Sequence, residues 1–278
     1  MENKIVFVDF DGTLAPEWGS VSAVVRQALA QARRNGHAVY LSTGRTAIEL
    51  SELASGIEHD GVVGAGGGFV RLGSEIVWRR CFDPARVVEI SRRLTADGID
   101  HYLQTDHALL ASAEVIANLP RRIFSRLPPD VPEDVRQQLE RFIGWFHQPG
   151  ADRLDQVYKF GFFGGHGLSR AELVARYGQW VDVLDAIIPL LGSDSGELLQ
   201  PGVSKATAMS WLLDRLGVDP GDTIAIGDSG NDVEMLQLAG VGIAMGNATA
   251  NLLAVADEVT GSVAEDGVAQ ALLRHGLV

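Results

Sequence analysis

The first eighty residues alternate between short, continuous apolar runs and stretches in which apolar residues recur every three or four positions. The continuous runs are Lys4–Val8, Ala38–Ser42 and Val62–Val63. Such runs are typical of strands that are covered on both faces. The periodic stretches predict a helix over 21–32, with Ser20 or Ser22 as N-cap and Gly36 as its stop, and a second helix over about 46–54. This rhythm predicts a parallel sheet with right-handed crossovers.

The C-terminal part of the chain returns to the same rhythm. Strands are expected over Thr223–Ile226 and Val241–Ala244, and helices over 206–216, 232–239, 248–255 and 267–274. Gly217 follows the first of these helices and is expected to end it. The two ends of the sequence therefore predict one parallel-sheet domain.

The middle of the chain has a different character. It holds seven of the ten prolines, and its strand candidates, His101–Gln104 and Gln156–Phe163, alternate more between apolar and polar residues. We interpret it as an inserted α+β module. The expected organisation is a core over 1–82, a module over 83–193 and the rest of the core over 194–278.

Composition describes a globular chain and narrows the range of partners. Of 278 residues, 46% are apolar and 21% are charged, which is enough to bury a full core. The formal net charge is −13, and Lys and Arg form no run longer than a pair. This argues against nucleic acid or an anionic membrane as the main partner. An acidic chain that acts on an anion needs local positive charge.

Cysteine usage and the N-terminus favour a cytoplasmic protein. Cys81 is the only cysteine, so no intramolecular disulfide is expected. The first apolar stretch is too short and too polar for a signal peptide, and no later run reaches the length of a membrane span.

Two acids follow the first predicted strand in the sequence VDFDGTLAP. Asp9 and Asp11 stand at positions i and i+2, so they can point to the same side at the carboxyl edge of the sheet, where open α/β sheets bind ligands. Two carboxylates there repel unless a cation neutralises them, and oxygen ligands suit Mg²⁺. The alternative is an Asp-Gly turn in which Asp11 bonds only to its own backbone.

A second acidic cluster lies in the sequence AIGDSGNDVEML. Asp228 follows another apolar strand, and Asn231 and Asp232 open the next helix. The alternative here is an N-cap box. Because two acidic strand ends in one parallel sheet come together, we expect Asp228 to share a metal site with Asp9, with Asp232 as a ligand or beside one.

Hydroxyl, glycine and cationic residues supply candidates for holding an anion. The stretch LSTGR ends the second strand, and there Thr43 and the backbone N–H groups of Gly44 and Arg45 could hold phosphate oxygens. An ordinary helix cap by Ser42 or Thr43 is the alternative. Lys205 stands in the first turn of a helix, an unfavourable end for a cation unless it is solvated or faces an anion.

These motifs together resemble the haloacid dehalogenase (HAD) superfamily, and within it the Cof-type phosphatases with a C2 cap. The resemblance rests on D-x-D-G-T-L from Asp9, S-T-G-R from Ser42, Lys205, and G-D-x-x-N-D from Gly227, in that order. It covers about 1–80 and 194–278. It implies a Rossmann-like α/β parallel-sheet core with an inserted α+β cap.

The resemblance also implies roles for single residues. Asp9 resembles the nucleophile that forms an aspartyl-phosphate, and Asp11 the acid/base. The phosphate-holding positions match Thr43, Lys205 and Asn231, to which we add Phe10, Gly44 and Arg45 as substrate-binding candidates. The Mg²⁺ ligands match Asp9, Asp228 and the backbone carbonyl of Asp11, with Asp232 beside them.

The glycine-rich stretch Gly64–Gly68 is where this chain departs from the family. The stretch lacks a dinucleotide-binding pattern, because Phe69 occupies the last glycine position, and we expect a hairpin turn. Relatives usually have Asn-Gly after the third strand, whereas here Ala65 precedes Gly66. Any contact that the family makes through this Asn is therefore not expected here.

The sequence thus predicts a Mg²⁺-dependent phosphatase that acts on a small phosphorylated metabolite. A phosphomutase, or a dedicated sucrose-, trehalose- or mannosylglycerate-phosphate phosphatase, is the alternative within enzymes. A phosphometabolite-binding regulator without turnover is a more distant alternative. The sequence leaves the substrate and the oligomeric state open.

Overall fold

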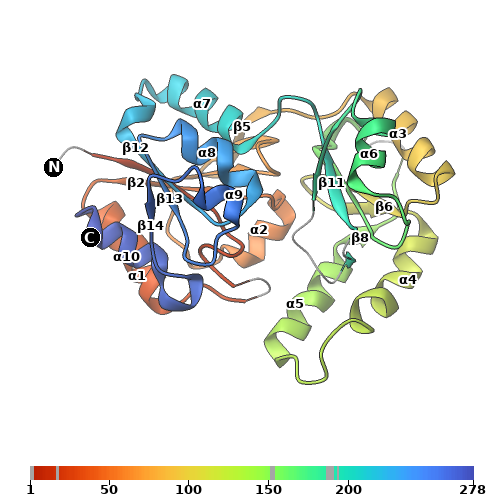
Figure 1. The fold of residues 1–278 in the computed structure, drawn as a ribbon, viewed down its shortest axis with the longest axis horizontal. Coiled ribbons are helices and arrows are strands. Elements are labelled where there is room, and N and C mark those ends of the chain that lie inside the picture. The colour runs from red at the N-terminus through yellow and green to blue at the C-terminus, as the bar shows by residue number, and fades with distance from the viewer. Residues whose placement is uncertain (1–2, 17–18, 151–153, 186–190, 193) are drawn as a thin grey trace. The chain divides into compact units, whose positions relative to one another are not determined.

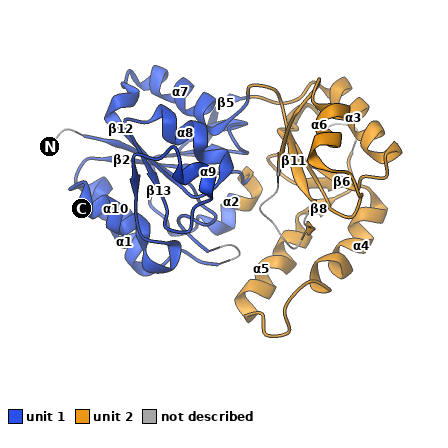
Figure 2. Cartoon of the chain, in the orientation of Figure 1, with its two compact units in different colours: residues 1–45, 50–79, 203–278 blue, residues 46–49, 80–202 orange. Residues whose placement is uncertain are grey.

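The computed structural model describes residues 3–16, 19–150, 154–185, 191–192 and 194–278. The chain divides into two compact units, which are coloured separately in Figure 2. The first unit contains Met1–Arg45, Leu50–Arg79 and Val203–Val278, and the second contains Thr46–Glu49 and Arg80–Gly202.

The first unit is built on an eight-stranded sheet, counted over the described residues (Figure 1). In spatial order the strands are β14 (Glu258–Val259), β13 (Val241–Ala244), β12 (Thr223–Gly227), β1 (Ile5–Val8), β2 (Ala38–Ser42), β3 (Gly61–Gly64), β4 (Phe69–Leu72) and β5 (Glu75–Arg79). The strands from β14 to β3 are parallel. The hairpin expected at Gly64–Gly68 is confirmed, because β4 runs antiparallel to β3.

Helices lie on both faces of this sheet. They are α1 (Ala23–Arg34), α7 (Lys205–Leu216), α8 (Val233–Leu238), α9 (Ala250–Leu253) and α10 (Gly267–Arg274). Of α2 (Ala47–Leu53), the residues from Leu50 onward belong to this unit. Helices α7 and α8 pack on the face that carries Phe7 and Tyr40, while α1 and α10 contact each other on the opposite face (Figure 1). Ser22 is the N-cap of α1, and Gly217 ends α7 in the left-handed conformation, as expected.

Two predicted helices are shorter than their sequence pattern. The helix expected over 232–239 begins only at Val233, because the Asp232 carboxylate turns back to accept hydrogen bonds from the preceding loop. The helix expected over 248–255 is reduced to Ala250–Leu253. Its start is fixed by the Thr249 amide, which donates to the Asp228 carbonyl at 2.9 Å. Hydrogen bonds to the loop 228–232 therefore set the first residue of both helices.

The second unit is an α+β module. Its six-stranded sheet, again counted over the described residues, has the order β10 (Asp182–Asp185), β11 (Gly196–Leu199), β9 (Lys159–Phe162), β6 (His101–Gln104), β7 (Leu109–Ala111) and β8 (Phe146–His147). Its helices are α3 (Pro84–Ala96), α4 (Ala113–Phe124), α5 (Glu133–Gly144) and α6 (Arg170–Tyr177). Helices α3 and α6 bury their apolar faces against Leu103, Phe160 and Leu198. The predicted strand over 156–163 is thus confined to 159–162.

One boundary differs from the expected organisation. Residues Gly196–Leu199 pair antiparallel with β9 and β10, so they belong to the sheet of the second unit. The chain returns to the first unit at Val203 rather than at 194. The sequence of a short strand does not indicate which sheet it pairs with, and GELL is compatible with the sheet of either unit.

Short 3₁₀ turns also occur at Leu154–Gln156, Pro220–Asp222, Gly230–Asp232 and Val263–Glu265. Among the helices of the described residues, none combines the length and the apolar character needed to cross a bilayer.

Candidate active site

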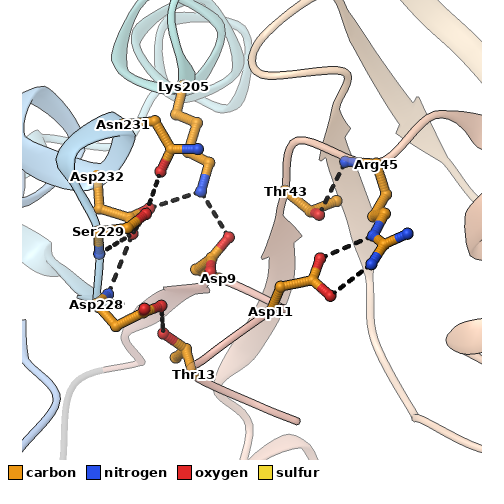
Figure 3. A network of polar contacts seen from close by, with 10 residues as sticks. All are labelled: Asp9, Asp11, Thr13, Thr43, Arg45, Lys205, Asp228, Ser229, Asn231 and Asp232. Atoms are coloured by element: carbon orange, nitrogen blue, oxygen red, sulfur yellow. Dashed lines mark hydrogen bonds and ion pairs between the residues drawn. The ribbon is translucent and has the colours of Figure 1, made fainter. Parts of the chain in front are cut away.

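Three strand ends meet at the carboxyl edge of the first sheet. Val8 lies beside Leu41 on one side and beside Ile226 on the other. The residues that follow these parallel strands, Asp9, Thr43 and Asp228, therefore lie at one edge, as the strand pattern predicted (Figure 3).

Three carboxylates gather at this edge. Asp9, Asp228 and Asp232 each offer an oxygen within 4.8 Å of the others. All three are buried, and Asp232 is 0% exposed. Carboxylates that are removed from water need positive charge or hydrogen-bond donors around them.

Lys205 supplies positive charge to this cluster. Its Nζ lies 2.5 Å from Asp9 Oδ1 and 2.6 Å from Asp232 Oδ1. Burial alone would lower the pKa of Lys205, but Asp232 and Asp9 outweigh it and the pKa is raised. The two carboxylates explain why a lysine stands at the N-terminal end of α7, where the helix dipole disfavours it.

The loops bring the carboxylates close by means of glycine and backbone donors. Asp232 Oδ2 accepts hydrogen bonds from the amides of Asp228 and Ser229, both at 3.1 Å, and Thr13 Oγ1 donates to Asp228 Oδ1 at 2.8 Å. A Cβ on Gly12, whose φ is +81°, would lie 2.3 Å from Asp228 Oδ2. Only glycine allows the Asp9–Asp11 turn to approach Asp228 so closely.

The electrostatics of the cluster fit a divalent cation. Burial raises the pKa of Asp9, and the charges of Asp232 and Asp228 raise it further against the opposing effect of Lys205. Burial, reinforced by Asp232, raises the pKa of Asp228 to about 6. Within the described residues, three carboxylates and one ammonium leave two negative charges. An all-oxygen donor set with this excess charge suits Mg²⁺.

The Asp11 carboxylate lies apart from this cluster. It faces Arg45, whose Nε and Nη2 donate to Oδ2 and Oδ1, each at 2.8 Å (Figure 3). Its side chain is therefore outside the three-carboxylate group, and only its backbone carbonyl remains as the predicted ligand. This ion pair was not predicted, because at the helix start only the backbone N–H of Arg45 was considered, as a donor to phosphate.

The predicted phosphate-holding residues are in part engaged with each other. Thr43 Oγ1 accepts a hydrogen bond from the Arg45 amide at 3.1 Å, so Thr43 forms the local cap that was considered as the alternative. Asn231 Oδ1 accepts from Ser229 Oγ at 2.8 Å, at the side of the cluster near Lys205 (Figure 3). Phe10 is buried, so only its backbone could contact a substrate. Thr13 and Ser229 were missed, although both lie inside the quoted motifs.

Comparison with known proteins agrees with this geometry. The family model described as haloacid dehalogenase-like hydrolase matches residues 6–272. The chain belongs to this family. Within the HAD superfamily it is a Cof-type phosphatase, a phosphoric monoester hydrolase with an α/β core and an inserted α+β cap module.

Similar proteins cover this phosphatase over nearly its whole length. The 5-amino-6-(5-phospho-D-ribitylamino)uracil phosphatase YcsE of Bacillus subtilis is 28% identical over 98% of this chain and 95% of its own. A solved haloacid dehalogenase-like hydrolase from B. subtilis has a TM-score of 0.78 and 26% identity, covering 98% of this chain and 99% of that one. The chloroplastic endoribonuclease YBEY of Arabidopsis thaliana is 29% identical over 97% of this chain, which spans only 46% of that longer protein.

The turn between β3 and β4 contacts the loop that carries Thr43 and Arg45. Ala65 has a φ of +53°, a left-handed conformation that is uncommon outside glycine, asparagine and aspartate. Its amide donates to the Arg45 carbonyl at 2.8 Å. A Cβ on Gly67 would lie 2.0 Å from the Ser204 carbonyl oxygen, so this glycine lets the turn pack against the start of α7.

Proposed function

We propose that this phosphatase is Mg²⁺-dependent and hydrolyses the phosphomonoester of a small metabolite through an aspartyl-phosphate on Asp9. The observation that carries the proposal is the placement of Asp9. It is one of three buried carboxylates that lie close enough for one cation, and Lys205 bonds to its Oδ1. Such contacts orient a carboxylate for nucleophilic attack on phosphorus.

The metal would be held by Asp9, Asp228 and the backbone carbonyl of Asp11, with Asp232 beside them. When bound, Mg²⁺ supplies positive charge to the acidic cluster and to the phosphoryl oxygens. The excess of two negative charges over Lys205 supports this assignment. Asp232 accepts two backbone N–H bonds and the Lys205 bond, which suits a residue that holds the loop in place.

The chain's own groups then carry the two halves of the reaction. An oxygen of Asp9 bonds to phosphorus as the ester P–O bond breaks, and Asp11 gives its proton to the departing alkoxide. Asp11 next takes a proton from water as the water oxygen attacks phosphorus, which releases phosphate and regenerates Asp9. The Asp11 carboxylate lies outside the three-carboxylate cluster and is 32% exposed, which supports a role separate from that of the metal ligands.

The phosphate oxygens would be held by Thr43, Asn231, Lys205 and the Gly44 amide. Charge-assisted and neutral donors at fixed positions are what phosphoryl transfer requires. We place the substrate among phosphorylated sugars or polyols. The support is that a relative of similar length, YcsE, is named for a compound with a phosphorylated ribityl group.

Phosphate release from a panel of sugar and polyol phosphates tests this function. We expect release with Mg²⁺, loss of release in chelator, and a loss of roughly a thousandfold or more in Asp9→Asn, because the nucleophile is removed. Asp60→Asn is the matched control: Asp60 precedes β3 at the opposite edge of the same sheet, and its variant should keep wild-type turnover. Undiminished turnover in Asp9→Asn or in chelator would refute the proposal.

A further inference from the structure

The Arg45 side chain is fixed at both ends. Its backbone amide donates to Thr43 Oγ1 at 3.1 Å, and its carbonyl accepts from the Ala65 amide at 2.8 Å. At the other end the guanidinium makes two 2.8 Å bonds to Asp11. The side chain is 9% exposed, whereas that of Asp11 is 32% exposed. A rigid, buried cation thus holds a carboxylate that is itself accessible.

A two-point contact does more than neutralise charge. The planar guanidinium engages both Asp11 oxygens at once and so fixes the position and the plane of the carboxylate. A single ammonium would provide the charge without fixing the plane. Holding one rotamer of the Asp11 side chain, which is 32% exposed, costs side-chain entropy, and the two-point contact offsets this cost.

The Arg45–Asp11 pair lies beside the cluster of three carboxylates, so the orientation of Asp11 affects the charge near that cluster. Asp11 is two residues from Asp9, whose cluster already carries an excess of negative charge. Without a cation of its own, a fourth carboxylate would either be repelled from the site or compete for the metal. Arg45 keeps it on the side away from Asp228 and Asp232 (Figure 3).

We propose that Arg45 is a positioning residue for proton transfer. Its guanidinium holds the Asp11 carboxylate where it can reach the leaving oxygen and the attacking water. The inference rests on the proposed function, in which Asp11 is the acid/base, and it adds a role for a side chain that does not itself touch the phosphate. The proposal therefore predicts that the effect of Arg45 on turnover depends on the presence of the Asp11 carboxylate.

A double-mutant cycle on p-nitrophenyl phosphate with saturating Mg²⁺ tests this dependence. Arg45→Met should lower kcat roughly tenfold to a hundredfold, part of what a positioned acid/base contributes, with KM changed less than about threefold. In an Asp11→Ala background the same substitution should change kcat less than about twofold. Losses that multiply instead would mean that Arg45 acts on the substrate, and would overturn the inference.

Two further variants keep the test independent of folding. Arg45→Lys retains the positive charge but cannot donate to both Asp11 oxygens from one planar group, so most of the kcat loss should persist. Full wild-type kcat in this variant would overturn the inference. Arg33→Met is the matched control. Arg33 donates two hydrogen bonds to the Asp60 carboxylate, at 2.9 and 2.8 Å, at the opposite edge of the sheet. Replacing Arg33 should leave kcat unchanged.

The same measurements separate this inference from the proposed function. If Asp9→Asn abolishes turnover while the losses at Arg45 and Asp11 multiply, the function stands and the positioning role fails. If Asp9→Asn turns over normally, the function itself fails, whatever the cycle gives.

Discussion

The two edges of the first sheet treat acidic residues in opposite ways. At the amino edge each of these acids faces a cation of the chain: Asp60 and Glu58 lie 2.8 and 3.3 Å from Arg33, and Asp222 lies 3.0 Å from Lys4. At the carboxyl edge Asp11 also has a cation, Arg45, but within the described residues the three carboxylates of the buried cluster lie against one ammonium, that of Lys205. The first arrangement satisfies its charges within the chain, whereas the second leaves them for a ligand.

The pKa shifts show the same contrast. For Asp60, burial alone would raise the pKa, but hydrogen bonds from Arg33 and from the Val39 amide outweigh it and the pKa is lowered. For Asp9, burial and two like charges together raise the pKa despite Lys205. The chain itself stabilises the Asp60 anion, whereas the Asp9 anion is destabilised and a bound cation could supply the missing charge.

Removing the cation at each edge should give the largest difference between them. Lys205→Met leaves buried carboxylates without a partner, so we expect the metal-free protein to lose about 3 kcal/mol or more of unfolding free energy at pH 7. Arg33→Met breaks a pair whose side chains are about 30% exposed, and should cost about 1 kcal/mol or less. Urea unfolding in chelator measures both values, and similar losses would erase the contrast.

Neutralising one acid at each edge should change stability with opposite sign. The pKa of Asp228 is raised to about 6, above its ordinary value near 4, so the native state binds more protons and metal-free stability falls as pH rises through that window. Asp228→Asn should therefore stabilise the metal-free protein by roughly 1–3 kcal/mol at pH 7.5, and the gain should vanish near pH 4.

Asp60→Asn is the counterpart at the amino edge. The pKa of Asp60 is lowered, so its stabilising contribution is present at neutral pH and is lost as pH falls through that lowered pKa. This variant should be destabilised at pH 7.5, with the loss shrinking in acid. Urea midpoints in chelator at the two pH values measure both signs, and a loss of stability in Asp228→Asn at pH 7.5 would contradict the comparison.

The sequence predicted the carboxyl edge because its geometry follows from strand ends. In a parallel sheet, residues that directly follow adjacent strands must lie together, so Asp9, Thr43 and Asp228 could be grouped before any coordinates were known. Lys205 could be added to this group because the helix dipole disfavours a cation at a helix N-terminus, unless the cation is solvated or faces an anion. The hairpin after β3 could be predicted from its glycines.

Features that depend on rotamers or on partner choice could not be predicted. The Arg45–Asp11 pair needs both side chains to turn toward each other, and no spacing rule specifies this over 34 positions of separation. In the second sheet β6 and β9 were predicted, but β8 with two residues and β7 with three were not, because they are too short for a periodic signal. The strand Gly196–Leu199 was assigned to the wrong part of the chain because its pairing partners decide its unit.

The smallest expected effect concerns backbone strain. Here the comparison is between Ala65, in the turn after β3, and Ala30, inside the regular helix α1. Ala65 is buried with a φ of +53°, a conformation that costs a non-glycine residue about 1–2 kcal/mol. Ala65→Gly removes this strain, but glycine loses about 0.5–1 kcal/mol through added freedom of the unfolded chain. The net result should be a gain of about 1 kcal/mol or less.

Ala30→Gly, inside α1, provides the reference, since the same substitution in an unstrained helix should destabilise by about 1 kcal/mol. Thermal or urea unfolding of both variants gives the two signs directly. A loss at position 65 equal to that at position 30 would show that the turn beside Arg45 holds no strain. A gain would show that this edge of the sheet contains a strained backbone position as well as destabilised carboxylates, both near the proposed catalytic residues.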